Sequence, residues 1–237
     1  MISAKKLFLP PEEEVLEFKG LKVKEKVVVE KRVLFGVHPC DINALQILDK
    51  AYSFKYKDSY YLAKRKNTLI IGVECQPSET CFCKSMGTLS VDKGYDLFLR
   101  EMDEEYYCVY IASKLGEKLT ESPIFEDVDS ALAIEVEKRF AEKVEEKIPV
   151  KIEGLPEKID ECFADEKIWS DIAKRCLGCG NCTMVCPICC CFNFMDTVDA
   201  DFKTSKRVRR WDACTLPDFS IVAGGGNFRP TIQHRIR

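Results

Sequence analysis

The sequence lacks the segments that mark a membrane-spanning or exported protein. No uninterrupted apolar run in its 237 residues reaches the roughly 20 residues needed to cross a bilayer. The first residues, up to Leu7, contain no apolar segment followed by a cleavage site. We therefore expect a cytoplasmic protein that makes no contact with a membrane.

Phosphate-binding loops, internal repeats and low-complexity tracts are also missing. There is no G-x-G-x-x-G loop, and the spacing at 224–226 (GGG) suits a turn rather than a phosphate site. The chain thus shows no flavin or nucleotide site of its own. With 46% hydrophobic and 32% charged residues, it is too apolar for a disordered chain and long enough for one or two domains.

Cysteine is the residue that the sequence has in excess, with 14 copies. A long chain without an export signal does not need a disulfide framework, so metal or redox chemistry in a reducing compartment is the better explanation. Eight of the 14 lie between Cys176 and Cys214, and a second set consists of Cys40, Cys75, Cys81 and Cys83. Cys108 and Cys162 stand alone, and we expect both in the core.

The first half of the chain has the pattern of an α/β domain. Two short apolar runs rich in β-branched residues, 33–37 and 68–73, read as strands, and 41–49 between them reads as a helix. This order predicts a parallel pair with a right-handed crossover. Residues 96–101 and 106–111 suggest a hairpin, and apolar residues at every fourth position predict a helix over 128–144.

A Pro-containing stretch near residue 150 suggests a linker between two domains. We predict an α/β domain with a short mixed or parallel sheet over 1–150, followed by a partial, mainly helical ferredoxin-like domain over 151–237.

Charge is unevenly distributed along the chain, because residues 201–237 carry eight Lys or Arg against three Asp, a net +5.

The strongest motif lies at the start of this second domain. Cys176, Cys179, Cys182 and Cys186, followed by Pro187, match the C-x2-C-x2-C-x3-C-P run that holds a [4Fe–4S] cluster. Glycines inside the run let the backbone approach the cluster closely, because they lack a Cβ. A zinc site would need two C-x2-C pairs separated by about a dozen residues or more, which this run does not offer.

The fourth ligand of this cluster is left open by the sequence. In two-cluster ferredoxins the fourth cysteine of each run binds the other cluster, and no second such run occurs here. The fourth ligand is either Cys186 or a remote residue, and Cys189, Cys191 and Cys214 are the candidates for additional ligands. Neighbouring side chains of an extended segment point to opposite sides, so Cys190 is assigned a structural role. The cysteine count allows one to three clusters.

The second set of cysteines follows the predicted strands of the first domain. Cys40 follows the first strand and begins a helix, whose N-terminus would favour a thiolate, while Cys75 follows the second strand. The carboxyl ends of neighbouring parallel strands form the edge at which α/β sheets build sites. Cys81 and Cys83 lie on a loop that can fold back to this edge, so the four cysteines predict a second cluster. His38 is assigned a structural role.

Several segments taken together resemble one protein family. The segments FGVHPCD at 35–41, CQPSETCFCKSMG at 75–87 and GYDL at 94–97 resemble the iron–sulfur beta subunit of soluble sulfhydrogenases, whose family also includes one of the subunits of anaerobic sulfite reductase. The C-terminal part agrees over 176–187, at Cys189, Cys191, Trp211, Cys214 and Pro217, and over 224–230 (GGGNFRP). Family members usually have a further N-terminal extension and a second ferredoxin run, and we expect both to be missing from this chain.

The resemblance implies a 4Fe–4S dicluster protein that acts as an electron-transfer subunit. Its expected partners are a flavoprotein that binds NAD(P)H and a catalytic subunit of the hydrogenase or sulfite reductase type. Two alternatives remain from the residues: an independent small iron–sulfur oxidoreductase, and a nucleic-acid-binding iron–sulfur protein that uses the basic residues of 203–210. The pI of about 5.7 disfavours nucleic acid, and a docking surface for an acidic partner subunit explains the same charges.

Overall fold

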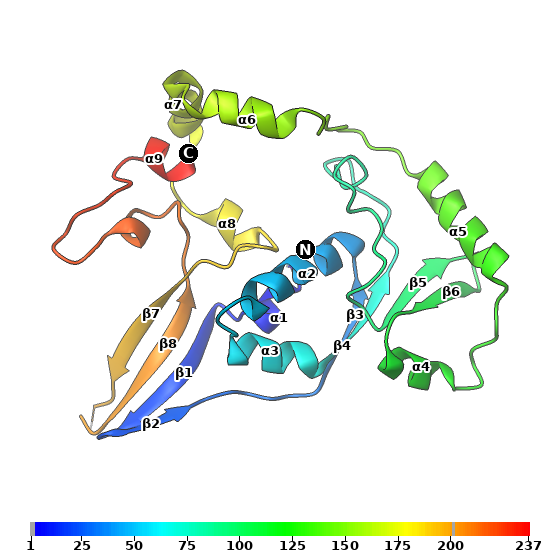
Figure 1. Cartoon of the computed structure of the whole chain (residues 1–237), viewed down its shortest axis with the longest axis horizontal. Coiled ribbons are helices and arrows are strands. Elements are labelled where there is room, and N and C mark those ends of the chain that lie inside the picture. The colour runs from blue at the N-terminus through cyan, green and yellow to red at the C-terminus, as the bar shows by residue number, and fades with distance from the viewer. Residues whose placement is uncertain (1–2, 201) are drawn as a thin grey trace. The chain divides into compact units, whose positions relative to one another are not determined.

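Two four-stranded sheets organise the chain, one in each of two compact units (Figure 1). The computed structural model describes residues 3–200 and 202–237. The terminal unit consists of Met1–Val28, Ser59–Tyr61 and Glu153–Arg237, and the central unit of Val29–Asp58 and Leu62–Ile152. The sequence patterns do not indicate this grouping of the first 28 residues with the C-terminal part.

The sheet of the central unit has the order β3-β4-β5-β6. Strands β3 (Arg32–Val37), β4 (Thr68–Val73) and β5 (Leu97–Glu101) are parallel, and β6 (Tyr107–Ile111) is antiparallel to β5. Helices α2 (Pro39–Ser53) and α3 (Ser59–Lys66) connect β3 to β4. The predicted parallel pair and the predicted hairpin are both confirmed.

Helices α2 and α5 (Ser130–Lys143) contribute to the core of the central unit together with its strands, and α4 (Lys114–Thr120) follows β6. Ile42, Leu45 and Leu48 of α2 are at most 1% exposed, which places the predicted apolar face of this helix in the core. A Cβ at position 72 would collide with the ring of Phe98 and the side chain of Ile42, so β4 needs Gly72 where α2 crosses it. The carboxyl ends of β3 and β4 are thereby fixed beneath the start of α2.

The sheet of the terminal unit is antiparallel throughout, with the order β2-β1-β8-β7. Its strands are β1 (Glu12–Lys19), β2 (Lys22–Glu25), β7 (Phe192–Val198) and β8 (Thr204–Trp211). The helices and helical turns of this unit are short: α1 (Lys5–Phe8), α6 (Leu155–Phe163), α7 (Glu166–Arg175), α8 (Asn181–Val185), η1 (Pro217–Ser220) and α9 (Ile232–Ile236). A mainly helical C-terminal domain is therefore not confirmed, because β7 and β8 form half of this sheet.

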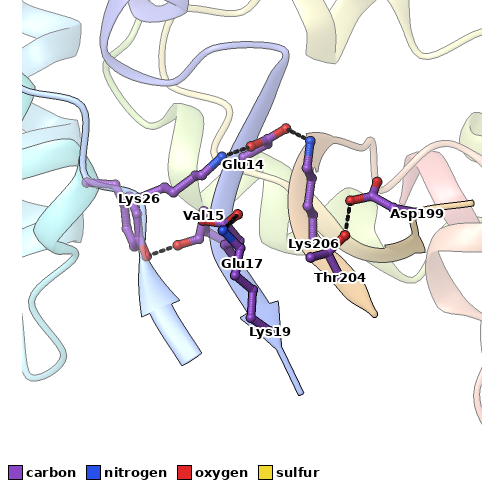
Figure 2. A network of polar contacts seen from close by, with 9 residues as sticks. Glu14, Val15, Glu17, Lys19, Lys26, Asp199, Thr204 and Lys206 are labelled. Atoms are coloured by element: carbon purple, nitrogen blue, oxygen red, sulfur yellow. Dashed lines mark hydrogen bonds and ion pairs between the residues drawn. The ribbon is translucent and has the colours of Figure 1, made fainter. Parts of the chain in front are cut away.

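Opposite charges line the junction of β1 and β8. Arg209 forms a buried ion pair with Glu13 at 2.7 Å, and Lys206 bonds to Glu14 at 2.9 Å. Figure 2 shows Glu14 held between Lys206 and Lys26 of the segment after β2. An ion pair also joins β8 to β7, since Arg207 pairs with Asp196 of β7 at 2.7 Å.

These ion pairs change the interpretation of the basic residues in 203–210. Within the sheet, glutamates of β1 compensate the charges of Lys206 and Arg209, and an aspartate of β7 compensates that of Arg207, so these pairs stabilise the pairing of the strands. Neither nucleic acid nor an acidic partner is needed to explain them. Within the described residues, no helix has the length and apolar character required to cross a membrane.

Candidate metal centre

The cysteine run lies on a tight double turn between α7 and α8. Cys176 ends α7, and the backbone N–H of Gly178 donates a hydrogen bond to the Cys176 sulfur at 3.3 Å. Gly178 and Gly180 both have left-handed backbone conformations, with φ of 63° and 74°. Glycine adopts this conformation at little cost, so the chain can turn twice within a few residues and keep its cysteines on one short loop.

Helix α8 and the residues after it complete the run. Gly180 caps the N-terminus of α8, which carries Cys182 in its first turn, and Cys186 ends the helix just before Pro187. Cys179 and Cys182 are exposed, while Cys176 and Cys186 are half-buried. All four have free thiols.

The loop packs against the segment that leads to Cys214. A Cβ at position 180 would lie 3.3 Å from both Ala213 and Leu216, so the loop backbone approaches this segment closely. Ala213 is fully buried. Free thiols, an N–H aimed at sulfur and two left-handed glycines together fit a cluster bound by thiolates. The residues present therefore suit a [4Fe–4S] cluster at this loop.

The three cysteines that are candidates for additional ligands lie close together. Burial raises the pKa of Cys191 to about 11, and negative charge on Cys189 and a hydrogen bond with Cys189 raise it as well. The backbone N–H of Cys214 interacts with the same sulfur and opposes the rise. Cys190, between the other two, is exposed rather than packed in the core.

The cysteines of the central unit influence one another electrostatically in pairs. The Cys40 side chain keeps contact with solvent, yet its sulfur is crowded enough that burial raises its pKa to about 11, with further increases from negative charge on Asp41, Cys83 and Cys75. Burial also raises the pKa of Cys75, to which Cys83 and Cys81 add. Burial thus outweighs the effect expected from the helix N-terminus at Cys40. Cys75 and Cys83 lie within electrostatic reach of Cys40, and Cys81 lies within reach of Cys75 and Cys83.

Contacts with the last turn of α5 and the segment after it hold the loop that carries Cys81 and Cys83. The Lys84 ammonium donates to the carbonyls of Ala141 and Val144, at 3.0 and 2.8 Å. The backbone N–H of Ser85 donates to the Glu146 carboxylate at 2.9 Å. The loop is therefore anchored through Lys84 and Ser85, which directly follow Cys83.

The remaining predicted residues are Cys108, Cys162 and His38. Cys108 is buried on β6, as expected, whereas Cys162 is only half-buried near the end of α6, so the core position predicted for it is wrong. His38 precedes α2, and its backbone carbonyl accepts the N–H of Ile42 at 3.1 Å; the structural role of its side chain stays a prediction. Within 3–200 and 202–237, no three His, Cys, Asp or Glu side chains converge closely enough to hold a single metal ion. A cubane cluster differs in this respect, because each of its thiolates binds a different iron.

Comparison with known proteins identifies the family. The chain is 40% identical over 241 aligned residues to sulfhydrogenase 2 subunit beta of Pyrococcus furiosus, an alignment that covers 100% of this chain and 71% of the relative. The chain belongs to the family of the sulfhydrogenase beta subunit. The family expected from the sequence motifs is thus confirmed.

The site agrees with the iron–sulfur character of this sulfhydrogenase beta-subunit family. A family described as a 4Fe–4S dicluster domain matches residues 175–237, a range that begins at the residue before Cys176 and includes the cysteines up to Cys214. No solved structure matches the chain.

One residue near these cysteines is not predicted by any sequence motif. Lys5 of α1 is 3% exposed and faces the segment around Cys186–Cys191. A single lysine far from a motif in the sequence carries no recognisable pattern. Only the burial of a charged side chain beside the cysteine-rich segment reveals it.

Proposed function

We propose that this chain is the iron–sulfur electron-transfer subunit of a cytoplasmic, sulfhydrogenase-like complex. It would pass electrons between a flavoprotein subunit that binds NAD(P)H and a catalytic subunit, and would have no substrate site of its own. The observation that carries this proposal is the glycine-turned loop of Cys176, Cys179 and Cys182, with its N–H aimed at sulfur. When bound, a [4Fe–4S] cluster takes up and releases a single electron at a time.

The chain's own residues would hold clusters at two or three positions. In the terminal unit, Cys176, Cys179 and Cys182 would bind one cluster, with Cys186 or a cysteine of the group Cys189, Cys191 and Cys214 as the fourth ligand. In the central unit, the mutual electrostatic effects among Cys40, Cys75, Cys81 and Cys83 support a further cluster at the carboxyl edge of the parallel strands. The relative is named as one subunit of a sulfhydrogenase, which supports a place for this chain in a multi-subunit complex.

Metal analysis of cysteine variants tests the cluster assignment. We expect anaerobically purified, reconstituted protein to contain iron and sulfide in equal amounts and to give EPR signals of reduced [4Fe–4S] clusters. The double variant C179S/C182S should lose about four irons per chain, and C75S/C83S should lose a different set of about four. The matched control C162S should keep the full complement, because Cys162 belongs to neither group. Fewer than about two irons per chain in the unaltered protein would contradict the proposal.

A kinetic experiment tests the role as a subunit. The isolated chain should not oxidise NAD(P)H, but it should be reduced quickly once an NAD(P)H-oxidising flavoprotein is added. Optical bleaching of the cluster absorbance follows this reduction. Rapid NAD(P)H oxidation by the chain alone would instead favour an independent oxidoreductase.

A further inference from the structure

Lys5 is a buried cation without a carboxylate partner among the described residues. Its side chain is 3% exposed, and its ammonium donates to the backbone carbonyl of Met184 at 3.1 Å. The ammonium also lies 4.1 Å from the centre of the Trp211 ring. One neutral acceptor and one aromatic face offset only part of the cost of removing a full charge from water. A buried ammonium in this position becomes favourable when a nearby anion compensates its charge.

The contacts of Lys5 lead to the second half of the cysteine-rich segment. Met184 stands two residues before Cys186 on the same short helix. Trp211 pairs with Phe192, the residue after Cys191, and the N–H of Asp212 donates to the Cys191 carbonyl at 3.1 Å. Both groups that hold the ammonium are therefore tied to the backbone that carries these cysteines.

The electrostatic surroundings of Lys5 agree with these contacts. Burial lowers the pKa of Lys5, whereas negative charge on Cys189, Cys186, Cys190 and Cys191 raises it. Four thiols thus lie within electrostatic reach of one buried ammonium. The anion that Lys5 lacks in the protein alone would be supplied by thiolates and the cluster that they bind.

The rest of α1 fixes the position of this charge. Phe8 is fully buried, and the indole N–H of Trp211 donates to the carbonyl of Leu9 at 3.0 Å. The backbone N–H of Trp211 donates to the carbonyl of Pro11 at 2.8 Å. The segment that carries Lys5 and the ring on which its ammonium rests are hydrogen-bonded to each other, which fixes the Lys5 backbone relative to this ring.

We infer that Lys5 is a positioning charge for a cluster bound by cysteines of the group Cys186, Cys189, Cys191 and Cys214, and that it raises the reduction potential of this cluster. The inference rests on the proposed function, because it requires a cluster in the terminal unit. Reduction adds a negative charge, and a fixed cation in a poorly solvated site stabilises the reduced form more than the oxidised form. Lys5 would thereby make this cluster easier to reduce.

Potentiometric titration followed by EPR tests the inference. Lys5→Met keeps an unbranched side chain of similar length and removes the charge, while Lys6→Met removes the charge of the exposed neighbour and serves as the matched control. We expect K5M to favour the oxidised form of one cluster by about tenfold, a fall in potential of about 59 mV for one electron. K6M should leave every potential unchanged. The species that shifts in K5M should be the one that is lost in C191S.

The outcomes separate this inference from the proposed function. Full iron content with unchanged potentials in K5M would overturn the role of Lys5 and leave the proposed function intact. Absence of clusters from the unaltered protein would overturn both. If K5M loses its cluster, Lys5→Arg decides: recovery of iron supports a requirement for positive charge, and continued loss shows that Lys5 serves packing alone.

Discussion

At Gly180, the backbone conformation of a single residue determines whether the cysteine run can close. This glycine combines a left-handed conformation with close contact to buried neighbours, whereas Gly224 has a similar conformation, with φ of 88°, and open space around it. The two positions therefore separate the cost of backbone strain from the cost of crowding.

We expect Gly180→Ala to cost more than Gly224→Ala. Both variants place a side chain in the left-handed region, at a cost of roughly 1–2 kcal/mol. G180A adds a methyl group 3.3 Å from Ala213 and Leu216 in a packed region, which raises its cost by about 1 kcal/mol or more. G180A should reconstitute with less iron and unfold at a lower temperature than G224A, as iron analysis and thermal unfolding would show. Equal iron content and equal unfolding temperatures of the two variants would show that the loop shifts to accommodate the methyl group.

At the scale of elements, the sequence predicts the strands, helices and motifs whose residue patterns lie within a short stretch of the chain. The parallel strands β3 and β4 are continuous apolar runs, and the stripe of α5 repeats along one helix, so both appear in short windows. The spacing of Cys176, Cys179 and Cys182 is equally local. The pairing of β1 with β8 joins residues as far apart as Glu13 and Arg209, 196 positions along the chain. Both strands are rich in charge, which hides their alternation until each is placed beside its partner.

The ladder between β1 and β8 predicts an acid-dependent loss of stability through Glu14. Hydrogen bonds from Lys26, and then from Lys206, lower the pKa of Glu14 below its ordinary value of 4.5 (Figure 2). Because the folded-state pKa is lowered, the stabilisation is present above the unfolded-state pKa and is lost as the pH falls through the folded-state value. Glu14→Gln should therefore unfold at a lower temperature than the unaltered protein at pH 7. The difference between the two should shrink at pH 4 and below.

Lys19→Met provides the matched control for this pH dependence. Lys19 is an exposed lysine of the same strand, and its ammonium pairs with Glu17. When Lys19 is replaced by Met in both proteins, the acid-dependent difference in unfolding temperature between the E14Q protein and its Glu14 counterpart should remain. A difference that stays constant from pH 7 to pH 4 would show that Glu14 contributes packing rather than charge.

At the scale of the whole molecule, the chain passes between its two units several times. Residues 1–28 start in the terminal unit, and the chain returns to that unit at residue 153 after building most of the central unit. The first 28 residues contribute β1, β2 and Lys5 to the terminal unit, so the cysteine run depends on a segment from the opposite end of the sequence. Assembly of this unit must therefore wait for residues beyond 204 to meet β1.

This arrangement predicts that a cut between the units leaves the terminal unit intact. A site for a sequence-specific protease inserted between Val29 and Glu30 lies in a segment without regular structure, where Val29 is exposed. After cleavage, the N-terminal fragment should stay bound, because β1 remains paired with β8 and the buried ion pair of Glu13 with Arg209 holds the ladder. The two fragments should co-elute from a size-exclusion column and keep their iron, and should separate only in denaturant. Elution of the N-terminal fragment alone under native conditions would show that connection through the intact chain, rather than the ladder and its charges, keeps this segment in place.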